Sequence, residues 1–186
     1  MIKKFTKLLF AIIWRVHSIV YLVQFKLRFR NQKVRLLNKG SGEMFKLIIH
    51  FSLEKSYLIK KDNLFTEFWL RFAGKHKLAL NQSKHKNFND KADVLQLILD
   101  SDLKNFTLLK SIDRKRKEYT QVYKEDAINI GEGNSNLIDN KLSKMLFEFK
   151  RNGLESYDHN SINFLQIGDQ IYMIDLDSFE FTQSRQ

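Results

Sequence analysis

The chain has 186 residues, of which 43% are hydrophobic and 28% charged, and this is the composition of a globular protein that buries a core. Cysteine and proline are both absent, which excludes disulfides, thiolate metal sites, a cysteine nucleophile and proline-rich linkers. Residues 1–61 carry 14 Lys and Arg against two acids, whereas residues 62–186 carry 18 against 19. Positive charge gathered at one end, beside the most hydrophobic stretch, favours an anionic membrane surface as partner and argues against a nucleic acid.

The first 30 residues predict a basic amphipathic helix. Nine Lys and Arg and no acid occur within the first 35 residues. One helical stripe is apolar and consists of Ile2, Phe5, Leu9, Ile12, Val16, Ile19 and Val23. A spanning helix is disfavoured because Arg15 near the centre of residues 8–25 costs about 2.5–3.5 kcal/mol on insertion. Two interpretations stay open: the stripe lies in the interface of an anionic membrane, or it packs on the protein's own domain.

The remaining elements alternate between short strands and helices. Apolar and β-branched runs predict a meander of three strands at residues 34–40, 44–51 and 56–61. Helices are expected at 64–80, 92–103 and 136–153, the last ended by Gly153. Further strands are expected at 106–113 and 118–126 around a basic turn, and at 164–167 and 171–175 around Gly168 and Asp169. This order predicts an α+β fold.

Three polar residues near the carboxyl terminus have the spacing of a phosphotransferase site. Asn163 follows Asp158 by five residues, and Asp175 follows Asn163 by twelve. Carboxylate and amide oxygens are the ligands that Mg²⁺ prefers. A three-residue hairpin loop, Gly168 to Gln170, would place Asn163 opposite Asp175 with about 5 Å between them, while a two-residue loop would put them on opposite faces. Both loops stay open, as does a surface hairpin with solvated carboxylates.

The same segment contains three short elements, Ser156-Tyr157-Asp158, Asn163-Phe164-Leu165 and Ile174-Asp175-Leu176. It resembles the catalytic loop and metal hairpin of protein-kinase-like folds, and is most similar to the bacterial lipopolysaccharide core heptose kinase family. The resemblance implies that Asp158 is the catalytic aspartate and that Asn163 and Asp175 are metal ligands. It also implies that Leu165 forms part of the adenine floor.

Resemblance extends more loosely into the amino-terminal half. Residues 57–60 match a V-A-I-K pattern, so Lys60 would hold the α- and β-phosphates of ATP, with Lys61 as the rival after a one-residue slip. Gly40 and Gly42 lie where a glycine-rich phosphate cover belongs, although a simple turn is the alternative. Glu67 is the candidate ion-pair partner of Lys60. The alternative is that Glu67 is a solvated residue on the face of a helix.

The resemblance implies a protein-kinase-like fold in three parts. Residues 1–32 would be the basic helical segment, 33–126 a small-lobe-like sheet with helices, and 127–186 a helix and metal hairpin from a truncated large lobe. The implied function is transfer of the ATP γ-phosphate, with Mg²⁺, to a sugar hydroxyl of a lipopolysaccharide core or related glycolipid. The chain would be cytoplasmic and peripheral on the inner face of the bacterial inner membrane. Because Ser156 and Tyr157 replace the usual His-Arg, and no glycine follows Asp175, an inactive pseudokinase or membrane-docked binding module stays open.

Overall fold

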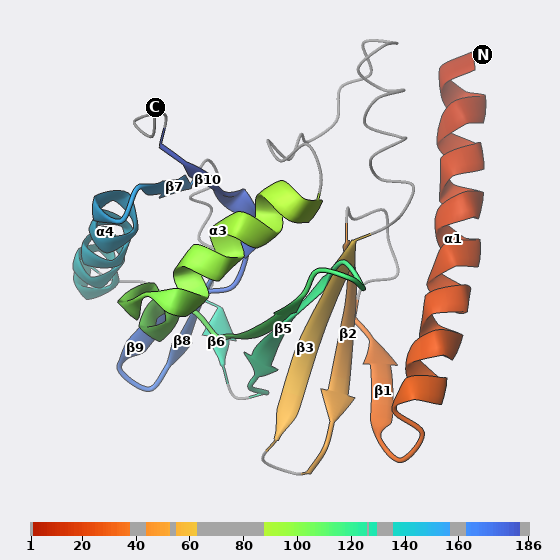
Figure 1. Ribbon diagram of the computed structural model, residues 1–186, viewed down its shortest axis with the longest axis horizontal. Helices are drawn as coiled ribbons and strands as arrows, with labels where there is room; N and C mark the ends of the chain where they lie inside the picture. The colour runs from red at the N-terminus through yellow and green to blue at the C-terminus, as the bar shows by residue number, and fades with distance from the viewer. Residues whose placement is uncertain are drawn as a thin grey trace. The chain divides into compact units, whose positions relative to one another are not determined.

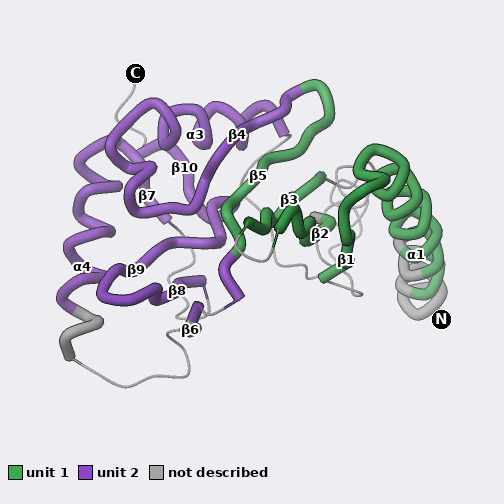
Figure 2. Tube along the Cα trace, turned by 90° about the horizontal axis from the view of Figure 1, so that it is seen from below, with its two compact units in different colours: residues 1–82, 115–123 green, residues 83–114, 124–186 purple. Residues whose placement is uncertain are grey.

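The computed structural model describes seven segments, residues 2–37, 44–52, 55–62, 88–125, 127–129, 136–156 and 163–182. They form two compact units (Figure 2). Unit 1 comprises residues 1–82 and 115–123, and unit 2 comprises 83–114 and 124–186. The three-part division expected from the sequence stays a prediction.

The described residues of unit 1 form a long helix and an antiparallel sheet (Figure 1). Its elements are α1 (Ile2–Arg28), β1 (Lys33–Leu36), β2 (Met44–His50), β3 (Ser56–Asp62) and β5 (Glu118–Tyr123). Within the unit the strand order is β1-β2-β3-β5, and every neighbouring pair is antiparallel. The predicted amino-terminal helix and the predicted three-stranded meander are both confirmed.

Helix α1 covers one face of this sheet. Its residues Tyr21 and Phe25 are buried against alternate residues of the strands, namely Phe45, Leu47 and Ile49 of β2 and Ile59 of β3. The Tyr21 and Phe45 rings meet edge to face, with their centroids 4.7 Å apart. The first turn of α1 contains no acid to complement the helix dipole, whereas its last turn carries Lys26 and Arg28, which do complement it.

A salt bridge joins the end of α1 to the last strand of the unit. The Arg28 Nη1 atom lies 2.5 Å from Oε1 of Glu118, whose side chain is only 4% exposed. The Arg28 guanidinium also lies over the Phe29 ring, 4.8 Å from its centroid. Two segments ninety residues apart in the sequence are therefore held together at this corner.

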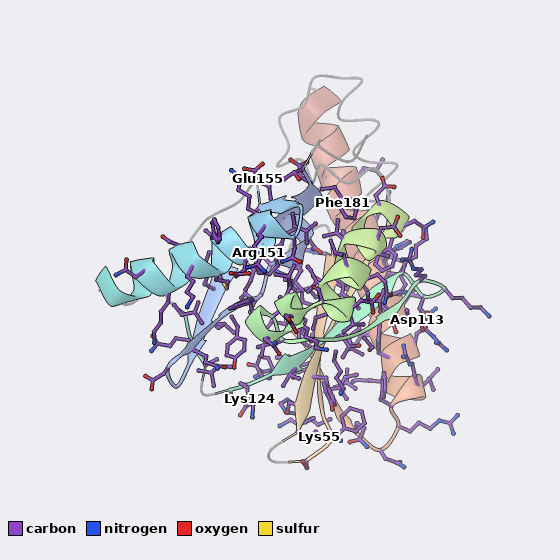
Figure 3. The ribbon with its side chains drawn as sticks, turned by 60° about the vertical axis from the view of Figure 1, so that its left-hand side comes forward. Lys55, Asp113, Lys124, Arg151, Glu155 and Phe181 are labelled. Carbon is purple, nitrogen blue, oxygen red and sulfur yellow. The ribbon has the colours of Figure 1, made fainter. Side chains whose placement is uncertain are left out.

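The described residues of unit 2 form two α-helices, two 3₁₀ helices and several short strands. Its elements are α3 (Phe88–Asp100), the 3₁₀ helix η1 (Asp102–Phe106), β4 (Leu109–Asp113), β6 (Ile128–Asn129), α4 (Asn136–Arg151), β7 (Leu154–Ser156), β8 (Phe164–Ile167), β9 (Gln170–Met173), the 3₁₀ helix η4 (Leu176–Ser178) and β10 (Phe179–Phe181). Strands β6, β8 and β9 form one small sheet, and β7 pairs with β10. Glu155 and Phe181 mark that second pair in Figure 3.

The core of unit 2 lies where α3 and α4 contact these strands. Helix α3 buries one face, which includes Phe88, Val94, Leu95 and Ile98. Helix α4 ends as predicted, since Gly153 has φ +77° and its N–H donates to the Lys150 carbonyl. The predicted helix at 64–80 lies outside the described residues.

Candidate functional site

Strand β3 carries the two lysines between which the sequence left a choice, and they lie on opposite faces. Lys61 lies on the α1 face, where its Nζ atom is 5.2 Å from the centroid of the Tyr21 ring and donates to the Arg116 carbonyl. Lys60 points the other way and is 2% exposed, with its Nζ atom 5.5 Å from the centroid of the Tyr119 ring. Lys61 thus contributes to the packing of α1, whereas Lys60 is a buried cation on the opposite face.

The face of β5 that carries Tyr119 also carries a buried amide. Gln121 is two residues along the strand, opposite Leu58, and is 1% exposed. Neither its Nε2 nor its Oε1 atom has a hydrogen-bond partner within the described part of the chain. A buried amide left unpaired costs about 1–3 kcal/mol, so Gln121 is a candidate contact for a polar ligand on the Lys60 face.

In unit 2 the predicted metal hairpin is formed by β8 and β9. The register pairs Phe164 with Met173 and Ile167 with Gln170, which leaves a two-residue loop of Gly168 and Asp169. Gly168 has φ +57°, as a type II′ turn requires at its first central position. The three-residue loop, one of the two geometries considered above, is therefore wrong.

This register changes how Asn163 and Asp175 are related. The N–H of Ile174 donates to the Asn163 carbonyl at 2.9 Å, so Ile174, rather than Asp175, lies opposite Asn163. Strict alternation would put Asp175 on the other face, but β9 ends at Met173 and Asp175 has φ −97° and ψ 77°. The direction of the Asp175 side chain is thus set by the η4 turn that follows it. Asn163 is 7% exposed and Asp175 is half-buried.

Two serines hold the backbone of Asp175 in place. The Asp175 carbonyl accepts from Ser178 Oγ at 2.8 Å and from Ser178 N at 3.3 Å. Ser178 Oγ lies 3.0 Å from Ser156 Oγ, and both residues are buried. Because the single hydroxyl proton of Ser178 goes to the Asp175 carbonyl, Ser156 is the donor between the two hydroxyls. Ser156 lies two residues before Asp158, so this chain of hydrogen bonds links the start of the predicted catalytic loop to the predicted metal ligand.

A buried lysine forms an ion pair with the η4 turn that follows Asp175. Lys91 of α3 is 4% exposed, and its Nζ atom lies 3.8 Å from Oδ1 of Asp177, which is 16% exposed. Asp177 belongs to η4, directly after Asp175 and Leu176. Helix α3 is therefore joined electrostatically to the turn that carries the predicted metal ligand.

Other predicted site residues fall in two groups. Leu165 lies half-buried in β8, between Tyr172 of β9 and Asn129 of β6, and its role in an adenine floor stays a prediction. Asp158, Gly40, Gly42 and Glu67 lie outside the described residues. No cluster of three His, Cys, Asp or Glu side chains suited to a metal occurs among the residues that are described. The predicted pair of Asn163 and Asp175 is not a set of that kind, because one of its members is an amide.

Sequence reasoning missed Gln121, Lys91 and Ser178. Gln121 lies between Tyr119 and Tyr123 on one face of a predicted strand, and a polar residue on that face was the available signal. Lys91 precedes the predicted helix at 92–103 and follows a polar stretch, so no signal in the sequence indicated its burial. Ser178 gave no signal, because its role depends on the pairing of β7 with β10.

Comparison with known proteins supports the fold. No family model and no curated protein matches the chain. Among solved structures, Rv3197 from Mycobacterium tuberculosis, in complex with erythromycin, matches with a TM-score of 0.55 and 15% identity over 80% of this chain and 46% of its own. The Rio2 kinase from Chaetomium thermophilum, in complex with ADP/Mg²⁺ and phosphoaspartate, matches with a TM-score of 0.54 and 13% identity over 88% of this chain and 53% of its own.

A third solved structure, choline kinase LicA from Streptococcus pneumoniae, has a TM-score of 0.47 at 13% identity, covering 88% of this chain and 70% of that one. The chain spans about half the length of the first protein matched, Rv3197, and of the Rio2 kinase. At these identities the likeness concerns the fold alone. The chain accordingly has an α+β fold of the protein-kinase-like class, as the sequence predicted.

Proposed function

We propose that this chain is a kinase-like phosphotransferase that moves the γ-phosphate of ATP to a sugar hydroxyl of a lipopolysaccharide core or related glycolipid. The observation that carries the proposal is the position of Lys60. A kinase-like fold presents a buried cation on β3, on the sheet face opposite α1 and beside the unpaired amide of Gln121. A buried cation and a free amide on one face suit an anionic ligand with a polar ring.

The donor atoms at the hairpin fit magnesium. Asn163 offers an amide oxygen and Asp175 a carboxylate, both of which are hard oxygen ligands. Two buried serines and the Lys91–Asp177 ion pair restrict the turn that carries Asp175, which would keep its carboxylate in one orientation. Mg²⁺ held there would neutralise charge on the phosphates.

In this proposal each residue has one task. Lys60 steadies the α- and β-phosphates, and Leu165 contributes to the surface under the adenine ring. Asp158 accepts a hydrogen bond from the acceptor hydroxyl and aligns it for attack. Positioning and charge neutralisation would supply most of the rate enhancement. The sugar acceptor, and a place at the inner face of a bacterial inner membrane, follow from the family resemblance.

Nucleotide binding is tested by thermal unfolding with and without Mg·ATP. A ligand present at 100 times its Kd stabilises the folded state by about 2.7 kcal/mol, so the wild type should melt at a higher temperature with nucleotide. Asp175→Ala should lose most of that shift. Asp169→Ala, which removes an exposed carboxylate of the same hairpin, is the matched control and should keep it. No shift in the wild type, or an equal shift in Asp175→Ala, would reject the proposal.

A second candidate function is a pseudokinase or binding module. Ser156 favours it, because this residue stands where kinases carry the histidine of the catalytic loop and here makes a structural hydrogen bond to Ser178. The two functions separate in an ATP turnover assay with a core-oligosaccharide acceptor, comparing the wild type with Asp158→Asn. Turnover that falls at least a hundredfold in the variant supports the enzyme, whereas nucleotide binding without turnover supports the pseudokinase.

A further inference from the structure

Helix α1 has a second apolar face, which points away from the sheet. Eight of the eleven large hydrophobic residues that are exposed in the described part of the chain lie on this one helix. They are Leu8, Leu9, Ile12, Val16, Ile19, Val20, Val23 and Leu27, each 46% to 63% exposed. The other three, Leu37, Phe51 and Phe147, lie on other parts of the chain, as single exposed apolar residues commonly do.

The eight residues form one continuous stripe, which is here called the outer stripe. At about 100° per residue they fall within an arc of about 120°, and Tyr21 and Phe25, which face the sheet, lie on the opposite side of the helix. The stripe contains five residues that the sequence placed on its predicted apolar face, Leu9, Ile12, Val16, Ile19 and Val23. Among the described residues these five side chains are exposed rather than packed on the sheet, which favours the interface interpretation.

The charge around the outer stripe indicates what covers it. Arg15 and Lys26 are exposed and border the stripe along one side. Nine Lys and Arg and no acid occur in the first 35 residues. A second copy of the helix would bring these cations together, whereas anionic headgroups would neutralise them. The stripe itself is purely aliphatic, which suits acyl chains.

We infer that α1 is a membrane-docking helix that lies flat on an anionic bilayer, with the outer stripe in the interface and its aromatic face on the sheet. Within the described residues no helix combines the length and hydropathy needed to cross a bilayer. Docking needs no nucleotide and no phosphate transfer, so it is independent of the proposed activity. The sheet remains attached because Tyr21, Phe25 and Arg28 hold it from the other side.

Sedimentation of the full chain with lipid vesicles tests this inference. The wild type should bind phosphatidylglycerol vesicles, should bind phosphatidylcholine vesicles at least tenfold more weakly, and should be released in part by high salt. The triple variant Ile12→Gln, Ile19→Gln and Val23→Gln should reduce partitioning at least tenfold, because three apolar side chains no longer enter the interface. Phe147→Gln removes an equally exposed apolar side chain from α4 and is the matched control; it should bind as the wild type does.

A second variant tests the charges without touching the stripe. Arg15→Gln with Lys26→Gln should weaken binding about 25-fold at low salt and much less at high salt, since each cation near an anionic surface is worth about fivefold. This variant keeps the test decisive if the triple variant fails to fold. Four results would each overturn the inference. The wild type could fail to bind vesicles, bind both vesicle types equally, or stay bound through a carbonate wash. The stripe variant could lose self-association in place of vesicle binding.

Discussion

The Arg28–Glu118 pair allows a quantitative test of how α1 is held on the sheet. The perturbation is Arg28→Met, which keeps an unbranched aliphatic side chain but removes the charged guanidinium, including its contacts over the Phe25 and Phe29 rings. Glu118, only 4% exposed, would then be a buried carboxylate without its Arg28 partner. Removing one partner of a fully buried pair costs about 3–5 kcal/mol. Because the Arg28 side chain is 37% exposed and therefore partly screened, we expect a loss of about 2 kcal/mol.

A double-mutant cycle in urea, followed by circular dichroism, isolates the pair. Glu118→Gln alone should cost less than Arg28→Met, because an amide tolerates burial better than a lone carboxylate. The double variant should recover at least about 1 kcal/mol of the summed losses. Lys26→Met, an exposed cation on the same helix, is the control and should change stability by less than about 0.5 kcal/mol. A coupling energy near zero would show that the short distance between Arg28 and Glu118 does not reflect a stabilising contact.

Three further predictions concern unit 1 and the hairpin. Gln121→Leu should raise the stability of the nucleotide-free protein by about 1 kcal/mol in urea unfolding, because it removes an unpaired buried amide; a loss of stability would mean that the amide is bonded in solution. Ser156→Ala should cost about 1 kcal/mol, since Ser178 loses its donor, and should reduce the thermal shift given by Mg·ATP. Ser156→Thr retains the hydroxyl and should restore that shift if the hydrogen bond matters. Gly168→Ala should cost about 1–2 kcal/mol in thermal unfolding. The loss comes from the φ of +57° alone, because an added Cβ would meet no atom within 4 Å. The control Asp169→Ala should be nearly neutral in the same assay.

Elements with a strong local pattern could be predicted from the sequence. The first three strands follow from β-branched and apolar runs separated by turn residues, and the end of α4 follows from Gly153, whose φ is positive. The start of α3 could not be placed, because residues 81–90 are mostly polar. Phe88 nevertheless belongs to the helix and is buried. Strands β6, β7 and β10 have two or three residues each, too few to show a period.

For the site, the sequence could supply residue types but not their register. The spacing of Asn163 and Asp175 is compatible with either hairpin loop, and only the pairing of Ile167 with Gln170 decides between them. The contacts that fix Asp175 depend on long-range pairing, since Ser156 and Ser178 are 22 residues apart. No local pattern carries information of that kind.

The strand order of unit 1 has a consequence for biosynthesis. Strand β3 pairs with β2 on one edge and with β5 on the other, although β5 follows β3 only after residues 63–117. While the ribosome has not yet released Tyr123, β3 is an open sheet edge, with Lys60 and Lys61 as the charged residues that discourage pairing with other chains. The same delay applies to Glu118, the partner of Arg28. The amino-terminal helix and strands therefore form an incomplete unit during translation, and we expect nascent chains stalled before Tyr123 to be prone to aggregation.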